Sequence, residues 1–110
     1  MTEDKDGFEA VADEGDIKEG GLLGVAVGGQ RVVLAKLEGR VYAIGGVCTH
    51  MGGDLAQGAL EGETLWCPLH RSGFNIKTGE ATNPPAKRPE PVYDVKLEGG
   101  RIWVSRKPRG

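Results

Sequence analysis

The apolar and polar residues follow short periods along this chain, which predicts β-strands rather than helices. Apolar, β-branched runs occupy residues 22–27, 31–37 and 41–44, and glycine-containing steps separate them. The Glu38-Gly39 step is typical of a hairpin turn. Near the end of the chain Tyr93, Val95 and Leu97 alternate with charged residues, which predicts one half-buried strand.

Further short strands are expected at residues 64–66, 74–76 and 102–104, with turns at 77–80 and 98–100. A helical pattern is suggested only at residues 12–18 and in a short turn near Leu55. We therefore predict an all-β fold, a small antiparallel sandwich or barrel. Because the chain has 110 residues and no interdomain linker, we expect a single domain over residues 1–110.

The composition supports this expectation and excludes some classes of partner. The chain contains 19 glycines and only two each of Phe, Trp and Tyr, as expected of short strands joined by tight turns. The formal net charge is −2, which gives no bulk electrostatic attraction to nucleic acid or to an acidic membrane surface. No apolar run reaches the length of a transmembrane helix, and the acidic start differs from a signal peptide. We expect a cytoplasmic protein.

Two short motifs contain all the cysteines and histidines of the chain. They are Cys48-Thr49-His50 and Cys67-Pro68-Leu69-His70, and each is followed by glycine within a few residues. Cysteine and histidine at such short spacing allow one loop to present two ligands to a metal. A structural zinc site also uses two cysteines and two histidines, so a zinc module is the first alternative.

The spacing differs from that of a zinc finger, in which cysteine is usually paired with cysteine and histidine with histidine. Here each motif contributes one cysteine and one histidine. Such mixed motifs suit a two-iron cluster in which one iron takes both thiolates and the other takes both imidazoles, which is Rieske ligation.

The segment CTHMGGDLAQGALEGETLWCPLHRSGFNIKTGEATNPP resembles the cluster-binding region of Rieske proteins. Over roughly residues 8–105 the chain resembles the small soluble Rieske-type ferredoxins that serve bacterial oxygenases. The resemblance implies one 2Fe-2S cluster, with Cys48 and Cys67 on the inner iron and His50 and His70 on the outer iron. It also implies a cluster-binding lobe at about residues 45–85, covered by a loop at Asn83-Pro84-Pro85.

Two departures from the wider family bear on the potential of the cluster. Respiratory Rieske proteins carry a disulfide between their two motifs, and this chain has Gly53 and Leu69 at those positions. Those proteins also place a serine and a tyrosine after the second motif. Here Ser72 matches the serine, but Phe74 replaces the tyrosine. The resemblance therefore implies the lower-potential branch of the family.

The resemblance implies a one-electron carrier that takes electrons from a flavin-dependent reductase and passes them to a terminal Rieske oxygenase. An oxygenase subunit needs further histidines for a mononuclear iron, and this chain has none to spare, so we expect no catalytic activity of its own. The alternatives are a Rieske-like small subunit of a larger reductase complex, such as a nitrite-reductase-like one, and the zinc module. Asp54, Glu61 and Glu63 are interpreted as surface charges, not acid–base catalysts.

Overall fold

The computed structural model describes residues 4–5, 7–47, 54–68, 72–83 and 89–109. Over these ranges the regular structure consists of three antiparallel sheets and two single-turn 3-10 helices, which confirms the all-β prediction. The helices are η1 (Glu14–Asp16) and η2 (Leu55–Gln57). The strands are β1 (Asp4–Lys5), β2 (Phe8–Asp13), β3 (Leu22–Val27), β4 (Gln30–Leu37), β5 (Arg40–Gly45), β6 (Ala59–Glu61), β7 (Thr64–Trp66), β8 (Gly73–Asn75), β9 (Ala81–Asn83), β10 (Val92–Tyr93), β11 (Val95–Glu98) and β12 (Arg101–Ser105).

The central layer is the sheet with strand order β10-β5-β4-β3, and both of its faces are covered. The continuous apolar run of β4 explains this, because successive side chains of a strand point to opposite faces. Val33 and Ala35 belong to one buried cluster, whereas Val32 and Leu34 belong to another. The central sheet therefore contributes to two hydrophobic cores, one on each side.

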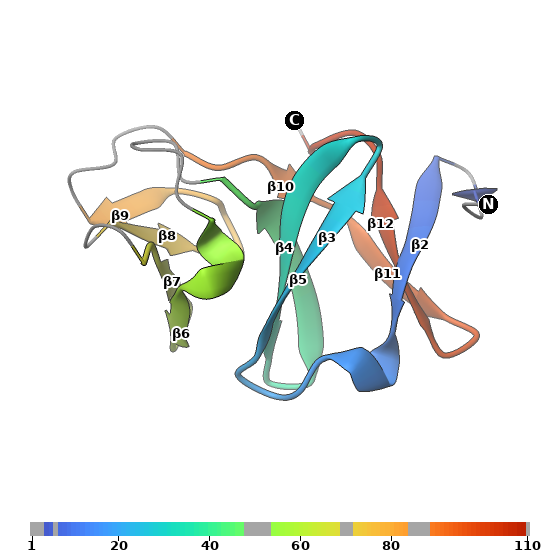
Figure 1. The fold of residues 1–110 in the computed structure, drawn as a ribbon, viewed down its shortest axis with the longest axis horizontal. Coiled ribbons are helices and arrows are strands. Elements are labelled where there is room, and N and C mark those ends of the chain that lie inside the picture. The colour runs from blue at the N-terminus through green and yellow to red at the C-terminus, as the bar shows by residue number, and fades with distance from the viewer. Residues whose placement is uncertain (1–3, 6, 48–53, 69–71, 84–88, 110) are drawn as a thin grey trace.

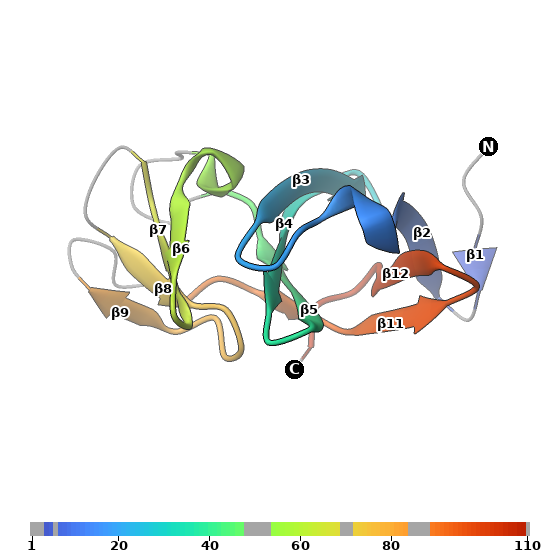
Figure 2. The same ribbon diagram turned by 90° about the horizontal axis from the view of Figure 1, so that it is seen from below.

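One core joins the central sheet to the small sheet β6-β7-β8-β9, and the other joins it to the sheet β1-β2-β12-β11 (Figure 1). The first core contains Leu55, Leu65, Phe74 and Ile76 from the inserted part of the chain. The chain leaves the central sheet after β5, forms β6 to β9, and returns as β10 (Figure 2). In this excursion the structure describes residues 54–68 and 72–83.

Tight two-residue turns join the long hairpins. Gly28-Gly29 links β3 to β4, and Glu38-Gly39 links β4 to β5, with both residues of each turn at positive φ. This conformation matches the twist of the flanking strands. Glu38 adopts a φ of 54° although it is not glycine, and the Glu19 carboxylate accepts hydrogen bonds of 2.6 and 2.9 Å from the backbone N–H groups of Glu38 and Gly39.

Two sequence predictions need correction. The single strand expected over Tyr93, Val95 and Leu97 is two strands, because the chain passes at Asp94 from the central sheet to the outer one. The helical pattern suggested at residues 12–18 is realised only as the short helix η1, Glu14–Asp16. There β2 ends and a single 3-10 turn follows, because β2 pairs with β12 and this pairing overrides the local pattern.

Candidate metal centre

The first cysteine–histidine motif falls in residues 48–53, and backbone contacts hold the described flanks of this segment together. Val47 and Asp54 form an isolated antiparallel bridge. The N–H of Leu55 donates to the Gly46 carbonyl at 2.9 Å, and the N–H of Gly46 donates to the Arg31 carbonyl of β4 at 3.0 Å. The described residues on the two sides of this segment therefore lie together beside the central sheet.

Asp54 fixes the exit from this segment. Its carboxylate accepts a 3.1 Å hydrogen bond from the N–H of Ala56, which caps η2, and lies 3.2 Å from the Arg31 guanidinium. From its sequence context, Asp54 is interpreted only as a surface charge. The signal that could have identified its role is the preference of aspartate for the position before a helical turn.

The second motif follows β7 directly, and β7 and β8 form the hairpin that presents it. Trp66 pairs with Gly73 at the end of the ladder, and the Cys67 N–H donates a 2.8 Å hydrogen bond to the Ser72 carbonyl. The Cys67 side chain is only 5% exposed and belongs to the same core cluster as Leu65 and Phe74. A thiol at residue 67 is thus held in apolar surroundings at the base of its loop.

Glycines allow the strands beneath this loop to approach closely. A Cβ at Gly58 would overlap the Trp66 carbonyl oxygen. A Cβ at Gly73 would lie 2.8 Å from the Thr64 methyl group and 3.2 Å from the Trp66 ring. The Trp66 indole Nε1 is buried and has no hydrogen-bond partner among the described residues. Gly58 could not be recognised from sequence, because nothing in the local pattern distinguishes it from a turn glycine.

Of the four predicted ligands, the structure describes Cys67 alone. Cys48, His50 and His70 lie outside the described residues, as do Gly53, Leu69 and the Pro84-Pro85 part of the predicted covering loop. The described part of the chain contains no group of three or more His, Cys, Asp or Glu side chains placed to hold a metal.

The described surroundings of Cys67 fit an iron–sulfur cluster. The thiol is buried among apolar side chains, and backbone bonds close the flanks of both motifs. A thiolate is a donor that such a cluster takes, and the apolar shell around it is one of the features that tune the cluster. Phe74 is fully buried and belongs to the same core cluster as Cys67, so the position to which the resemblance assigns the tyrosine of respiratory Rieske proteins lies in the apolar core here.

Comparison with known proteins agrees with this donor chemistry. A family model described as the Rieske [2Fe-2S] domain matches residues 7–98. The chain belongs to the Rieske family. This membership confirms the predicted cofactor, one Rieske-type 2Fe-2S cluster. The alternative of a structural zinc module is therefore not favoured.

Individual relatives indicate which type of Rieske protein this chain is. The chain is 41% identical over 97 residues to the ferredoxin component of the naphthalene 1,2-dioxygenase system of Pseudomonas putida, covering 88% of this chain and 92% of that protein. It superposes on the ferredoxin of carbazole 1,9a-dioxygenase from Nocardioides aromaticivorans IC177 with a TM-score of 0.85 and 33% identity, covering 89% and 96% of the two chains.

A third match is a chain from a complex of oxygenase and ferredoxin in carbazole 1,9a-dioxygenase. Its TM-score is 0.89 at 26% identity, with 96% of this chain and 99% of that chain covered. These relatives confirm a Rieske-type ferredoxin, an electron-transfer component that is not catalytic on its own, and do not favour the nitrite-reductase-like alternative. In the described ranges no helix is long and apolar enough to cross a membrane.

Proposed function

We propose that Cys48 and Cys67 hold one iron of the cluster and that His50 and His70 hold the other. Support comes from the mixed motifs and from the buried Cys67 thiol at the base of a loop closed by the hydrogen bond to Ser72. When bound, the cluster accepts and returns one electron. The protein supplies thiolates and imidazoles at fixed spacing and an apolar shell that limits the access of water.

In its physiological role the protein carries single electrons from a flavin-dependent reductase to a terminal Rieske oxygenase. Three matches support an oxygenase as the acceptor: the naphthalene dioxygenase ferredoxin component, the carbazole dioxygenase ferredoxin, and the complex of oxygenase and ferredoxin in carbazole 1,9a-dioxygenase. The reductase is implied by the family resemblance. We further propose that the chain acts as one Rieske domain over residues 1–110, with its cluster-binding lobe at about residues 45–85, in the cytoplasm.

The ligand assignment is tested by metal analysis of single variants. The purified protein should contain about two irons and two acid-labile sulfides per chain, as this cluster type requires. His50→Ala, His70→Ala and Cys67→Ser should each lose most of the iron and the visible absorbance. Thr49→Ala is the matched control, because it changes the first motif between its two proposed ligands. A variant of a proposed ligand that keeps the parent iron content and spectrum would remove that residue from the set.

The carrier role is tested by mixing the reduced protein with candidate acceptors. The oxidised form, with NADH and a flavin-dependent ferredoxin reductase, should be reduced to the extent of one electron per chain. A terminal Rieske oxygenase should then reoxidise it in a stopped-flow experiment. Reduction without any reoxidation by Rieske oxygenases would contradict the proposed acceptor class while leaving the ligand assignment intact.

A further inference from the structure

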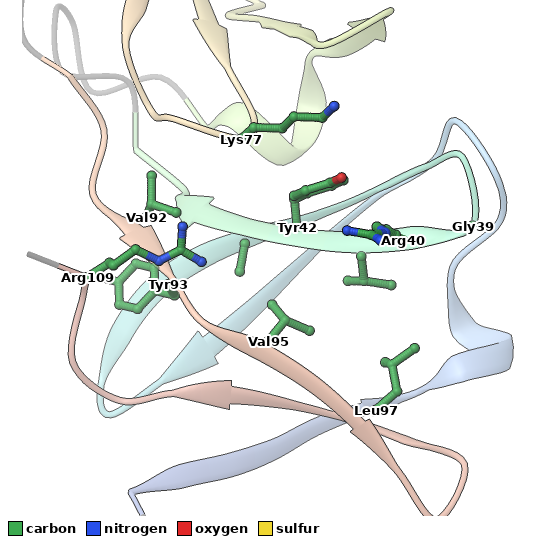
Figure 3. Close-up of a pocket in the computed structure, with 11 residues that line it drawn as sticks. Gly39, Arg40, Tyr42, Lys77, Val92, Tyr93, Val95, Leu97 and Arg109 are labelled. Carbon is green, nitrogen blue, oxygen red and sulfur yellow. The ribbon is translucent and has the colours of Figure 1, made fainter.

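The strands β5 and β11 lie next to each other but form no ladder, and the seam between them is open. On the side away from β4, β5 pairs with β10 only through Ala43 and Ile44. The first half of β5 therefore has a strand partner only on the β4 side. β11 pairs with β12 alone and ends its sheet. Figure 3 shows the two strands diverging beyond β10.

The hydrogen bonds of β5 show which peptide groups face this seam. The Gly45 N–H donates to the Pro91 carbonyl at 2.8 Å, so the peptide group of Gly45 faces β10. Alternate residues of an antiparallel strand direct their N–H and C=O groups to the same neighbour. Ala43 and then Val41 therefore face the same side, and at Val41 no described strand is paired there.

The peptide groups of β11 also alternate between its two sides. The Ser105 N–H donates to the Asp94 carbonyl at 2.9 Å, so Asp94, and by alternation Lys96, faces β12. Val95 and Leu97 consequently direct their peptide groups away from β12 and toward the seam. The seam is therefore lined on both sides by backbone N–H and C=O groups that can pair with another strand.

A cavity of about 530 Å³ lies along the seam. Val41, Val95 and Leu97 are among its lining residues, and Figure 3 shows Val95 and Leu97 between the two strands. Leu97 is 45% exposed, one of the few large apolar side chains with that exposure in the described ranges. An exposed apolar edge with open backbone groups is a site at which another strand can pair.

The charged residues that line the cavity are all basic: Arg40, Lys77 and Arg109. Lys77 lies 3.3 Å from Glu63, and Arg109 lies 2.8 Å from Asp94, but these pairs are exposed, and such pairs exchange partners at little cost. Arg40 has no ion pair with any described residue. The rim is therefore complementary to carboxylates.

We propose that the seam binds an acidic, extended segment of a partner polypeptide, which adds as a strand between β5 and β11. The open peptide groups of Val41, Val95 and Leu97 supply main-chain hydrogen bonds, and Arg40, Lys77 and Arg109 bind the acidic side chains. A polypeptide is favoured over a small anion because the unpaired N–H and C=O groups lie along two strand edges. A small anion would instead need several N–H groups that point to one place. The described residues that flank the two cluster motifs do not line this cavity. The segment would thus tether a partner while the cluster motifs remain accessible, which raises the effective concentration of that partner.

The test uses the cluster-containing protein and a synthetic peptide of about six residues, the usual length of a strand. The peptide alternates glutamate with valine and carries a fluorophore for anisotropy titrations. A matched peptide replaces glutamate with lysine, and a third carries N-methyl groups on alternate peptide nitrogens, which blocks strand pairing without changing charge. Arg40→Glu is the test variant, and Lys107→Glu makes the same charge change outside the cavity.

The acidic peptide should bind, with affinity falling as salt rises, and the lysine peptide should not. Arg40→Glu should weaken binding by about fivefold or more, and Lys107→Glu by less than about twofold. N-methylation should weaken binding by about tenfold, the effect of losing one or two hydrogen bonds. Bound peptide should slow amide exchange at Val41, Val95 and Leu97. No saturable binding, equal binding to Arg40→Glu, or equal binding of the N-methylated peptide would each overturn the proposal.

Discussion

The backbone N–H of Cys67 donates a 2.8 Å hydrogen bond to the carbonyl oxygen of Ser72. This bond closes the second cysteine–histidine loop at its base and continues the β7–β8 ladder, whose last pair is Trp66 and Gly73. The closure depends on the two strands approaching closely, and that approach depends on a residue without a Cβ at position 73. The stability of the loop is therefore linked to the packing of the hairpin below it.

Gly73→Ala should loosen this hairpin. The new Cβ would lie 2.8 Å from the Thr64 methyl group and 3.0 Å from the Thr82 hydroxyl oxygen, so the strands must separate. Overpacking of this kind costs about 1–3 kcal/mol of unfolding free energy. Urea titration should show this loss, and the visible absorbance of the cluster should decay faster in air. Gly15→Ala is the control, because a Cβ at that position meets open space. Equal stability of the two variants would contradict this account of the hairpin.

Phe74→Tyr should raise the reduction potential of the cluster. Phe74 and Cys67 belong to one core cluster, and the prediction assumes that a hydroxyl added to the ring reaches the proposed ligand sulfur. A donor to that sulfur stabilises the more negative, reduced state. Because a charge-assisted hydrogen bond contributes about 1.5–3 kcal/mol and only its difference between redox states counts, the shift should be on the order of tens of millivolts.

Voltammetry of the intact protein measures this shift. Phe8→Tyr is the matched control, since the Phe8 ring lies on β2 with the Lys96 ammonium 4.8 Å from its centre. An unchanged potential in Phe74→Tyr, with the cluster retained, would mean that the new hydroxyl does not reach the sulfur.

The two tryptophans should respond differently to replacement by phenylalanine. The Trp103 indole donates a 3.2 Å hydrogen bond to the Glu98 carbonyl, whereas the buried Trp66 Nε1 has no partner among the described residues. Trp103→Phe should therefore lose about 1 kcal/mol through the hydrogen bond, besides any packing loss. Trp66→Phe removes an unsatisfied buried donor, which offsets its packing loss. Urea titration of both variants compares the costs, and a larger loss for Trp66→Phe would show that its N–H has an acceptor in the intact protein.

Acid should weaken the turn between β4 and β5. The pKa of Glu19 is lowered, first by the hydrogen bond from the Gly39 N–H and then by that from the Glu38 N–H. A carboxyl group whose pKa is lower in the folded state stabilises the fold above its unfolded pKa. That contribution is lost as the pH falls through the folded pKa, which lies below 4.5.

Glu19→Gln tests this linkage. The variant should be less stable than the parent near neutral pH, and the difference should shrink in acid, where the parent carboxylate also becomes protonated. Chemical denaturation at several pH values measures it. Glu14→Gln is the control, because Glu14 lies on η1 and the N–H groups of the turn donate to Glu19 instead. A pH-independent difference would contradict the role of the Glu19 charge.

The long hairpins could be predicted from sequence because their patterns are local. The run at residues 22–27 forms β3 with the expected bounds, and Glu38-Gly39 forms the expected turn. The division of the late strand at Asp94 could not be predicted, because alternation of Tyr93, Val95 and Leu97 is the same whether one sheet or two receives it. Only the pairing of β10 with β5 and of β11 with β12 separates them.

The chemistry of the candidate site could be predicted from the sequence, but the contacts that hold the site in place could not. Residue type and spacing were sufficient to predict a Rieske cluster, because only a few side chains can ligate iron. The ion pair of Arg31 with Asp54 and the close approach of Gly58 to Trp66 depend on contacts between residues that are separated along the chain. Such contacts have no signature in a single short window of sequence.

The hydrogen bond between Gly45 and Pro91 has a consequence for how such proteins can diversify. The chain departs from the central sheet at Gly45 and returns at Pro91, and these residues are joined at 2.8 Å. The described strands β6 to β9 lie between these two residues in the chain and pair only with one another, so their replacement need not alter the register of β5 and β10. Exchange of the excursion between homologous scaffolds is constrained chiefly by the apolar surface that it shares with Val33, Ala35 and Ile44. Recombination at the Gly45–Pro91 pair is therefore a physically permitted route by which one scaffold can acquire a different redox lobe.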